Sequence, residues 1–418
     1  MSLVNFYKNN KEAYLISLRK RGLDTQLLDQ LDKLIEEKSK KLTDLQNRQR
    51  EINEKTPSSV PTERIRQDMR TLAANAKIAE DLLKKINEEL NELLNKLPNL
   101  VSPDSPEGAE EDFKILKEWG EKPEIESPKD HEQIGKDLNL IDFEAGTKVA
   151  GTKFYYLKNE AVFLEFALIH FVLNILKSEG FIPMITPQIA KNSILESIGF
   201  APKGPEKQVY GLDEEGLSLI GTSEITLGGY HQDETIPAEK LPLKYAGFST
   251  CFRTEAGAYG KHSKGLYRVH QFDKLEMFIY CLPEDSEKMH QYLLSLEEKI
   301  FQELNIPYRV VDIAAGDLGA AAYRKFDVEA WMPGRGDYGE VTSASNTTNY
   351  QAMRLNEKFD KNGQKDFVHT LNGTAIAISR ALIAILENFQ QADGSVKIPE
   401  VLVSYTGFAK ISPKNSSE

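Results

Sequence analysis

Residues 268–278 have the sequence RVHQFDKLEMF, in which polar and apolar side chains alternate. In a strand, successive side chains point to opposite faces. One face then carries a polar row around a single aromatic ring: Arg268, His270, Phe272, Lys274 and Glu276. From this pattern alone, an exposed salt-bridged strand face is the more common explanation.

The run 243–253 precedes this strand and has the composition of its hairpin partner. Just beyond it, Arg253 and Glu255 are again two residues apart. The glycine-bearing connection 256–265 is expected to be a long mobile loop. Short alternating strands and helices fill the rest of the chain after residue 128, without the regular rhythm of a parallel sheet. We therefore predict an α+β domain whose mixed, mainly antiparallel sheet is flanked by helices.

Two further groups of polar residues accompany predicted strands. After the strand 366–371, Asn372-Gly373-Thr374 leads into an apolar helix expected over 375–389, with Arg380 two turns in. A helix start offers amides to a phosphate, although an arginine on an apolar helix is usually snorkelling. The second group, Glu340-Val341-Thr342-Ser343, could bind a hard cation through its oxygen atoms, but that signal alone is weak.

The N-terminal part shows two heptad stripes of apolar residues, over 28–52 and over 65–97. The turn 56–62, which contains two prolines, is short enough to require an antiparallel coiled-coil hairpin. Within residues 38–77, ten Lys or Arg side chains stand against five Asp or Glu, a local charge of 10 − 5 = +5. A solvated coiled coil or a dimerisation arm explains this about as well as an RNA-binding tip does.

The whole chain has a net charge of −12, so a nucleic-acid site should be local. Two cysteines, Cys251 and Cys281, lie apart and indicate neither a disulfide framework nor a zinc site. The apolar stretch 161–176 is interrupted by polar residues, which favours a buried helix and no membrane role. We expect a cytoplasmic protein with an arm over 1–101, a Pro- and Glu-rich linker over 102–128 and a catalytic domain over 129–418.

Three motifs in order resemble those of the class II aminoacyl-tRNA synthetases, and within that class the bacterial seryl-tRNA synthetases. Motif 1 resembles 180–187, motif 2 runs from Cys251-Phe252-Arg253-Thr254-Glu255 to Phe272 and Glu276, and motif 3 covers 373–380. The hairpin, the trio Thr222-Ser223-Glu224 and the run 370–374 are similar to the serine enzyme. The resemblance covers nearly the whole chain up to Phe408.

This resemblance implies the reaction: ATP-dependent activation of L-serine and transfer of the seryl group to tRNA(Ser), with charging of selenocysteine tRNA left open. It further implies a homodimer that uses ATP and Mg²⁺ and whose arm binds the long variable region of the tRNA. Arg253 and Arg380 would be catalytic. The implied ATP site is Arg253, Thr254, Glu255, Val269, Phe272, Glu340, Val341, Thr342, Ser343 and Arg380. The implied serine site is Thr222, Ser223, Glu224, Glu276, Asn372 and Thr374. Glu340 and Ser343 would hold the Mg²⁺ that accompanies ATP.

In the third motif, Ala375 stands where the family usually has its second glycine, and Ser379 precedes the arginine. Neither change removes a ligand. Three alternatives remain: a ligase for another amino acid, a ligase that charges carrier proteins, and a catalytically silent RNA-binding relative. Carrier ligases lack the long arm, and a silent relative would be expected to have lost Arg253, Glu276 or Arg380.

Overall fold

The computed structural model describes residues 2–55, 62–200, 208–212, 216–255 and 264–413. The chain divides into two units, Met1–Leu100 and Val101–Glu418. The predicted hairpin turn lies outside the described residues except for Thr62, and so does the predicted mobile loop up to residue 263.

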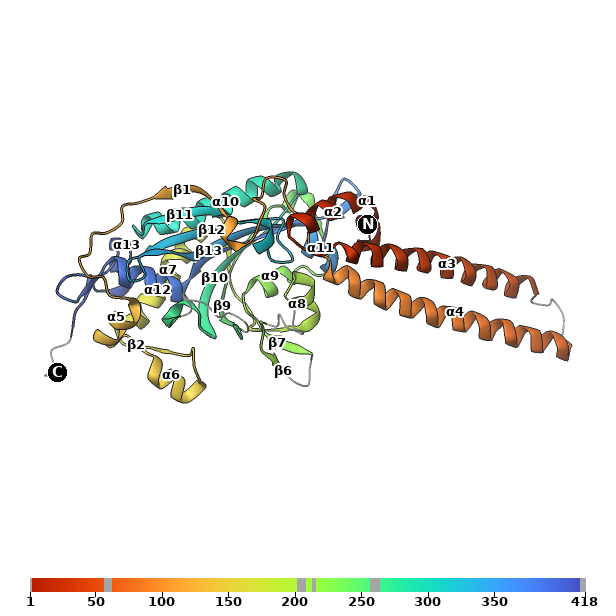
Figure 1. The fold of residues 1–418 in the computed structure, drawn as a ribbon, viewed down its shortest axis with the longest axis horizontal. Helices are drawn as coiled ribbons and strands as arrows, with labels where there is room; N and C mark the ends of the chain where they lie inside the picture. Colours follow the sequence, from red (N-terminus) through yellow and green to blue (C-terminus); the bar gives the residue numbers. More distant parts are fainter. Residues whose placement is uncertain (1, 56–61, 201–207, 213–215, 256–263, 414–418) are drawn as a thin grey trace. The chain divides into compact units, whose positions relative to one another are not determined.

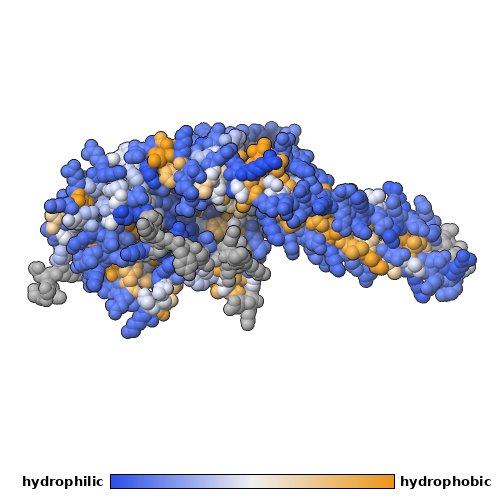
Figure 2. Space-filling view, in the orientation of Figure 1, coloured by the Kyte–Doolittle hydropathy of each residue, from blue (hydrophilic) through white to orange (hydrophobic). Residues whose placement is uncertain are grey.

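The first unit is helical, and the predicted hairpin is confirmed (Figure 1). Its elements are α1 (Leu3–Asn9), α2 (Lys11–Lys20), α3 (Gln26–Lys55) and α4 (Glu63–Lys96). Figure 2 shows hydrophobic residues along the two long helices between hydrophilic flanks. Burial is concentrated at the base, where Leu31 and Leu90 are almost fully enclosed, while Leu42 nearer the tip is 41% exposed. The heptad stripe placed Leu93 at the seam, but Leu94 is the more deeply buried residue.

Helices α1 and α2 were not predicted from the sequence. Tyr7 and Leu18, each 1% exposed, belong to the same hydrophobic cluster as Leu31 and Leu90. The Tyr7 hydroxyl donates to a carboxylate oxygen of Asp32 at 2.9 Å. The two short helices therefore contribute to the core at the base of the hairpin.

The second unit is organised around an eight-stranded sheet (Figure 1). In spatial order its strands are β1 (Lys114–Trp119), β11 (Tyr308–Asp312), β12 (Arg324–Met332), β13 (Asp337–Thr348), β16 (His369–Ala377), β10 (Gln271–Cys281), β9 (Leu243–Phe252) and β4 (Ile182–Ile185). All neighbours are antiparallel except β4 and β9, which are parallel. The predicted hairpin of residues 243–278 is thus confirmed as the β9–β10 pair.

One hydrophobic core joins the central strands to three helices, α7 (Glu160–Ser178), α10 (Ser286–Glu303) and α12 (Ile378–Asn388). On β10, Leu275 and Met277 point into this core and are fully buried. Because side chains alternate along a strand, Phe272, Lys274 and Glu276 point to the opposite face. Three residues of the predicted polar row therefore lie on the face of β10 away from this core, whereas Arg268 and His270 precede the strand, which begins at Gln271 and not at 268.

Shorter elements surround the sheet. The helices are α5 (His131–Asp137), α6 (Phe143–Ala150), α8 (Asn192–Ile198), α9 (Glu224–Gly228), α11 (Tyr350–Leu355) and α13 (Glu400–Thr406). The strands are β2 (Ile141–Asp142), β3 (Tyr156–Leu157), β5 (Ile189–Lys191), β6 (Gly211–Leu212), β7 (Leu217–Leu219), β8 (Thr235–Pro237), β14 (Lys358–Lys361), β15 (Gln364–Phe367), β17 (Val396–Lys397) and β18 (Lys410–Ile411). A 3-10 turn, η3 (Gly265–Tyr267), precedes β10.

Two expectations about element boundaries change. The segment 102–128, interpreted from composition as a linker, carries strand β1 and pairs with β11 at the sheet edge. Its side chains are mostly exposed, so its charged sequence resembles that of a linker. Helix α12 begins at Ile378, not at 375, because residues 374–377 continue β16 and pair with β10. Arg380 accordingly lies in the first turn of the helix, and Thr374 lies on a strand.

Helix α7 is the one helix in the described ranges that is long and apolar enough to cross a membrane. A core helix of a soluble protein passes the same test. Leu164, Leu168 and Val172 are fully buried in the main core, as the sequence predicted, whereas Phe163 and Phe166 are more than 60% exposed. The helix thus has one core face and one uncovered apolar face.

Candidate active site

Arg253 follows β9 and lies against the aromatic residue of the polar row. Its guanidinium group is 5.4 Å from the centre of the Phe272 ring, and its Nε donates a hydrogen bond to the Gly221 carbonyl oxygen at 3.1 Å. Glu255, two residues on, has a positive φ of 46° and accepts a hydrogen bond from Arg268 at 3.1 Å. The sheet therefore brings Arg253, Glu255 and Phe272 together, as the strand pattern predicted.

Arg380 reaches the same place from the other end of the chain. Its Nη1 lies 2.9 Å from Oε1 of Glu340 and 3.1 Å from the Glu340 carbonyl oxygen. Its guanidinium group lies 4.8 Å from the centre of the Tyr267 ring. Burial alone would raise the pKa of Glu340, but the positive charges of Arg380 and Lys325 outweigh it and hold that pKa below its ordinary value. Glu340 is therefore an ionised partner for Arg380.

Two carboxyl groups lie beside these arginines. Glu276 forms a buried ion pair with Lys274 at 2.5 Å and accepts a hydrogen bond from the Thr374 hydroxyl at 3.3 Å. Glu224 accepts a hydrogen bond from the Asn372 side-chain amide at 2.9 Å. Burial, with a further contribution from the charge of Glu276, raises the pKa of Glu224 to about 7. These groups provide one carboxyl group paired with a lysine and one readily protonated carboxyl group for a small polar ligand.

A cavity of about 50 Å³ opens among these side chains. Its lining comprises Arg253, Glu255, Tyr267, Arg268, Val269, Phe272, Lys274, Glu340, Val341, Thr374, Ala377, Ser379 and Arg380. Pockets that enclose ligands of drug size are several times larger, about 300–1,000 Å³. Both partners of the Arg380–Glu340 ion pair line this cavity.

A β-bulge changes which face the residues of β13 occupy. Strict alternation would place Glu340 and Thr342 on one face, but the register shifts between Val328 and Glu329 of β12, so that Val341 is the extra residue. The Thr342 hydroxyl consequently points into the core and donates to Glu297 at 2.9 Å. The Thr342 side chain therefore points away from the cavity.

Ser343, which follows Thr342, points to the opposite face because side chains alternate along the strand. There it lies opposite Asp327 on β12 and hydrogen bonds to that carboxyl group. The bulge therefore places Glu340 and Ser343 on the same face of the sheet.

Two residues of the predicted serine site use their hydroxyl groups in hydrogen bonds to the backbone. The Ser223 hydroxyl is fully buried and donates to the Gly247 carbonyl oxygen at 2.8 Å. The Thr222 hydroxyl, 1% exposed, accepts a hydrogen bond from the Glu224 amide at 3.2 Å. Their side chains hold the loop that carries Glu224. Among the predicted ATP residues, Thr254 is placed by a backbone hydrogen bond from its amide to Gln208.

Sequence reasoning did not select Lys274, Tyr267 or Gln351 as site residues. Lys274 was recognised in the alternating row, and its pairing with Glu276 two residues on was a usable signal. Gln351 lies on α11, far along the chain, and its amide donates to Glu224 at 2.9 Å. Only the folded chain brings it there, so no local pattern could have found it.

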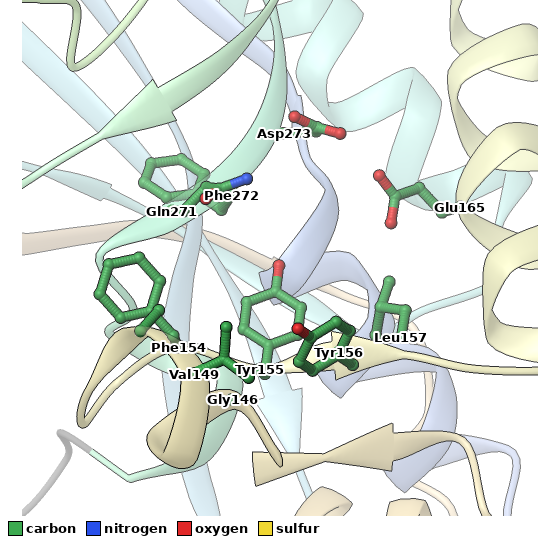
Figure 3. Close-up of a pocket in the computed structure, with 11 residues that line it drawn as sticks. Gly146, Val149, Phe154, Tyr155, Tyr156, Leu157, Glu165, Gln271, Phe272 and Asp273 are labelled. Carbon is green, nitrogen blue, oxygen red and sulfur yellow. The ribbon is translucent and has the colours of Figure 1, made fainter.

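A second cavity, of about 380 Å³, lies beside the Phe272 end of β10. Figure 3 shows the carboxyl groups of Glu165 and Asp273 on one side of it and the rings of Phe154 and Tyr155 on the other. Burial, together with a hydrogen bond to Asp273, raises the pKa of Glu165 to about 8. Among the predicted site residues, Phe272 is the one that lines this cavity. The smaller cavity between Arg253 and Arg380 is therefore the candidate active site.

Comparison with known proteins identifies a consistent group of relatives. The family model for the tRNA synthetase class II core domain (G, H, P, S and T) matches residues 210–389. A serine–tRNA ligase of Treponema denticola is 54% identical over 417 residues, covering 97% of this chain and 99% of the relative. One from Dictyoglomus turgidum is 51% identical over 422 residues, covering 98% and 99%.

Solved structures agree with these relatives. The seryl-tRNA synthetase of Pyrococcus horikoshii complexed with ATP superposes with a TM-score of 0.91 at 38% identity, covering 99% of each chain. The cytoplasmic serine–tRNA ligase of Naegleria fowleri in complex with AMP has a TM-score of 0.87 at 32% identity, covering 99% of this chain and 98% of that one.

Proposed function

The chain belongs to the seryl-tRNA synthetases, and on that premise we propose how its residues carry out the reaction of the family. The enzyme activates L-serine with ATP and transfers the seryl group to tRNA. One observation carries the assignment of roles: Arg253 and Arg380, 127 residues apart in the sequence, line one cavity with Phe272 and Glu340.

ATP would bind with its adenine on the Phe272 ring, with Glu255 and the backbone at Val269 at the edge of the base. This places the triphosphate between the two arginines. Arg253 would contact the α-phosphate and Arg380 the γ-phosphate. Since Arg380 is ion-paired with Glu340, a phosphate must compete with that carboxylate for the guanidinium group.

The chemistry requires positive charge more than a general base. The serine carboxylate is already ionised near neutral pH and attacks the α-phosphorus directly, releasing pyrophosphate. Negative charge grows on the α-phosphate in the transition state, where Arg253 would stabilise it. Arg380 would hold the leaving pyrophosphate. The first step leaves seryl-adenylate. In the second step the 3′-terminal ribose hydroxyl of the tRNA attacks its carbonyl carbon, the ester bond to the phosphate breaks, and AMP leaves.

The residues present fit a Mg²⁺ ion that accompanies ATP. Glu340 and Ser343 share one face of the sheet and offer a carboxylate and a hydroxyl, which are oxygen ligands of the kind this ion prefers. The described ranges hold no group of three or more His, Cys, Asp or Glu placed to bind an ion. An ion here would take its other ligands from phosphate and water. When bound, it would neutralise part of the phosphate charge.

Serine would occupy the space between Glu224, Glu276 and Thr374. A carboxylate and a hydroxyl aimed at the substrate hydroxyl reject alanine, because the analogue leaves these polar groups without a partner. Asn372 would act by orienting Glu224 through the 2.9 Å hydrogen bond. Threonine would be excluded by the limited space.

Serine binding should weaken in acid because of Glu224. The raised pKa, about 7, means that the carboxyl group carries a proton below that pH. The serine ammonium group favours the ionised form, so binding must then release this proton. We expect the KM for serine to rise by up to about tenfold per pH unit as the pH falls below 7. Serine-dependent ATP–pyrophosphate exchange between pH 6 and 8 measures it.

The matched control for this prediction is Glu224→Gln. It should have a high KM for serine that is flat over the same pH range, while the KM for ATP changes little in either protein. A wild-type KM for serine that stays constant down to pH 6 would contradict the role of Glu224.

The homodimer expected for this family would use the uncovered apolar residues of α7 and of β4, the strand within motif 1. Phe163 and Phe166 on α7 and Ile185 on the edge strand β4 are 61%, 66% and 86% exposed. Large contiguous apolar surfaces usually mark interfaces. Phe166→Asp should shift the protein from dimer to monomer in analytical ultracentrifugation. Ile16→Asp, which replaces a residue of the helical unit that is 59% exposed, should not. A dimeric Phe166→Asp protein would exclude this surface.

The tRNA partner would be tRNA(Ser), bound by the hairpin arm, and selenocysteine tRNA is a second candidate because it shares a long variable region. Shape and backbone contacts suffice for such recognition. The proposed location of the enzyme is the cytoplasm. ATP–pyrophosphate exchange with each of the twenty amino acids and without tRNA tests the function. Exchange with serine alone is expected, and exchange with another amino acid would overturn the serine site.

A further inference from the structure

A buried histidine connects the start of α5 to the segment before β10, which lines the proposed ATP site through Tyr267. His131, 7% exposed, is the first residue of α5. Its Nε2 accepts a hydrogen bond from the Leu266 amide at 3.1 Å, and its Nδ1 lies 2.8 Å from Oε1 of Glu387 on α12. No motif in the sequence marked either His131 or Glu387.

The hydrogen-bond partners determine the tautomer of this ring. The Leu266 amide can only donate, so Nε2 must carry a lone pair. Nδ1 then carries the proton and donates it to the Glu387 carboxylate. The His131 ring therefore faces a donor on one side and an acceptor on the other.

Glu387 holds three segments at once. Besides the ring, it accepts hydrogen bonds from the His131 amide at 3.1 Å and the Gly334 amide at 2.8 Å. Gly334 lies in the turn between β12 and β13, and a Cβ there would come within 2.6 Å of the Asp130 backbone. With 2% of its surface exposed, Glu387 thus clamps α5, this turn and its own helix.

The segment that His131 contacts, residues 265–267, carries a lining residue of the proposed ATP site. A Cβ on Gly265, whose φ is +60°, would lie 2.1 Å from Nε2 of His131, so chain and ring are in close contact. Leu266 is fully buried, and the next residue, Tyr267, lines the cavity with its ring under the guanidinium group of Arg380. The position of the Leu266 amide therefore restrains where the Tyr267 ring lies relative to Arg380.

We propose that His131 is a positioning residue for ATP binding. Through its hydrogen bond to Leu266 it holds the Tyr267 ring in the position in which Arg380, stacked on that ring, contacts the terminal phosphates. Glu387 supports it by fixing the ring and its tautomer. The role extends the proposed ATP site and rests on it. It gives α5, which follows the acidic segment 102–128, a task in nucleotide binding.

Two isosteric substitutions separate the acceptor from the donor of the ring. His131→Asn keeps a donor where Nδ1 lies but loses the acceptor for Leu266. His131→Gln can place its carbonyl oxygen where Nε2 lies but loses the donor to Glu387. Leaving the buried Leu266 amide without a partner should raise the KM for ATP about tenfold in His131→Asn. In His131→Gln the KM for ATP should stay within about twofold of the wild-type value.

The KM for serine should be unchanged in both proteins, and both should lose thermal stability to a similar degree. If His131 had only a structural role, the two variants would lose stability equally, and their KM values for ATP would change by the same factor or not at all. That pattern would overturn the proposal. Wild-type exchange activity tests the ATP site itself, so failure of the site and failure of this inference are distinguishable.

A double-mutant cycle with Tyr267→Leu gives a second test that does not depend on comparing the two His131 variants. If His131 acts through Tyr267, then adding His131→Asn to Tyr267→Leu should change the KM for ATP by less than about twofold. A full tenfold further increase would show that His131 acts by another route and would refute the proposal. Circular dichroism of each full-length variant establishes that it is folded.

Discussion

Replacing Arg253 with alanine is expected to lower serine-dependent ATP–pyrophosphate exchange by about a thousandfold, while the affinity for tRNA stays nearly unchanged. The magnitude follows from removing one positively charged group aimed at transition-state charge on a phosphate, for which losses of about a hundredfold to a hundred-thousandfold are typical. The side chain is pre-positioned for this task by its hydrogen bond to Gly221 and by the Phe272 ring.

The substitution should do little to the fold itself. Arg253 lies just after β9, and its backbone amide and carbonyl are both bound to His270, so the strand end is held without the side chain. Arg309→Ala is the matched control. This arginine belongs to β11 of the same sheet and is ion-paired with Glu329, away from the cavity. It should retain nearly full exchange activity.

Arg253→Lys separates charge from geometry. A lysine keeps the positive charge but loses the planar, forked donor of the guanidinium group, so it should recover only part of the activity. Fluorescence anisotropy with labelled tRNA completes the experiment. Exchange by Arg253→Ala within tenfold of the wild type, or an equally large loss of tRNA affinity, would contradict the role given to this residue.

The strand pattern of motif 2 could be predicted because its chemistry is local. Along β10, the alternation of Phe272, Lys274 and Glu276 with Leu275 and Met277 is visible within eleven residues, and the hairpin with β9 follows from it. The hairpin arm was equally visible, since its apolar stripes are long and regular. Patterns of this kind require no knowledge of distant residues.

Other features depend on neighbours that the local sequence does not show. Residues 375–377, Ala-Ile-Ala, are apolar and would suit a helix start, but pairing with β10 keeps them in β16. The bulge opposite Val328 turns Thr342 into the core and brings Ser343 to the face of Glu340. Strict alternation predicts the reverse arrangement. Tertiary pairing, not propensity, decides both cases.

The contacts of longest range were invisible to sequence reasoning. His131 and Glu387 are separated by 256 residues and meet in the core. Each resembles an ordinary polar residue at a helix end or on a helix. A single sequence gives no signal for such a pair.

Removing residues 38–77 and closing the hairpin with a short glycine-containing turn should leave serine activation intact and abolish aminoacylation. The deleted part carries the local charge of +5 on an acidic protein, and it is the part expected to touch RNA. Charging of tRNA should fall by at least about a hundredfold, equivalent to a loss of roughly 3 kcal/mol in binding. ATP–pyrophosphate exchange should remain within about twofold of the wild type.

The truncated unit should still fold, because its core lies outside the deletion. The hydrophobic cluster at the base, which includes Tyr7, Leu31 and Leu90, draws on α1, α2 and the proximal parts of α3 and α4. What the deletion removes is the distal hairpin, where Leu42 is 41% exposed and burial is sparse. Circular dichroism should show a loss of helix in proportion to the residues removed.

A variant of full length separates charge from shape. Changing Arg64, Arg66 and Arg70 to glutamine keeps the hairpin, since the ion pair of Arg66 with Glu63 is exposed and of a kind that contributes little to stability. It should raise the KM for tRNA and flatten the salt dependence of tRNA binding, because fewer phosphate contacts release fewer ions. Undiminished charging by the truncated protein would show that the arm is not a tRNA-binding element. Loss of charging in the deletion but not in the glutamine variant would show that the arm acts through its shape.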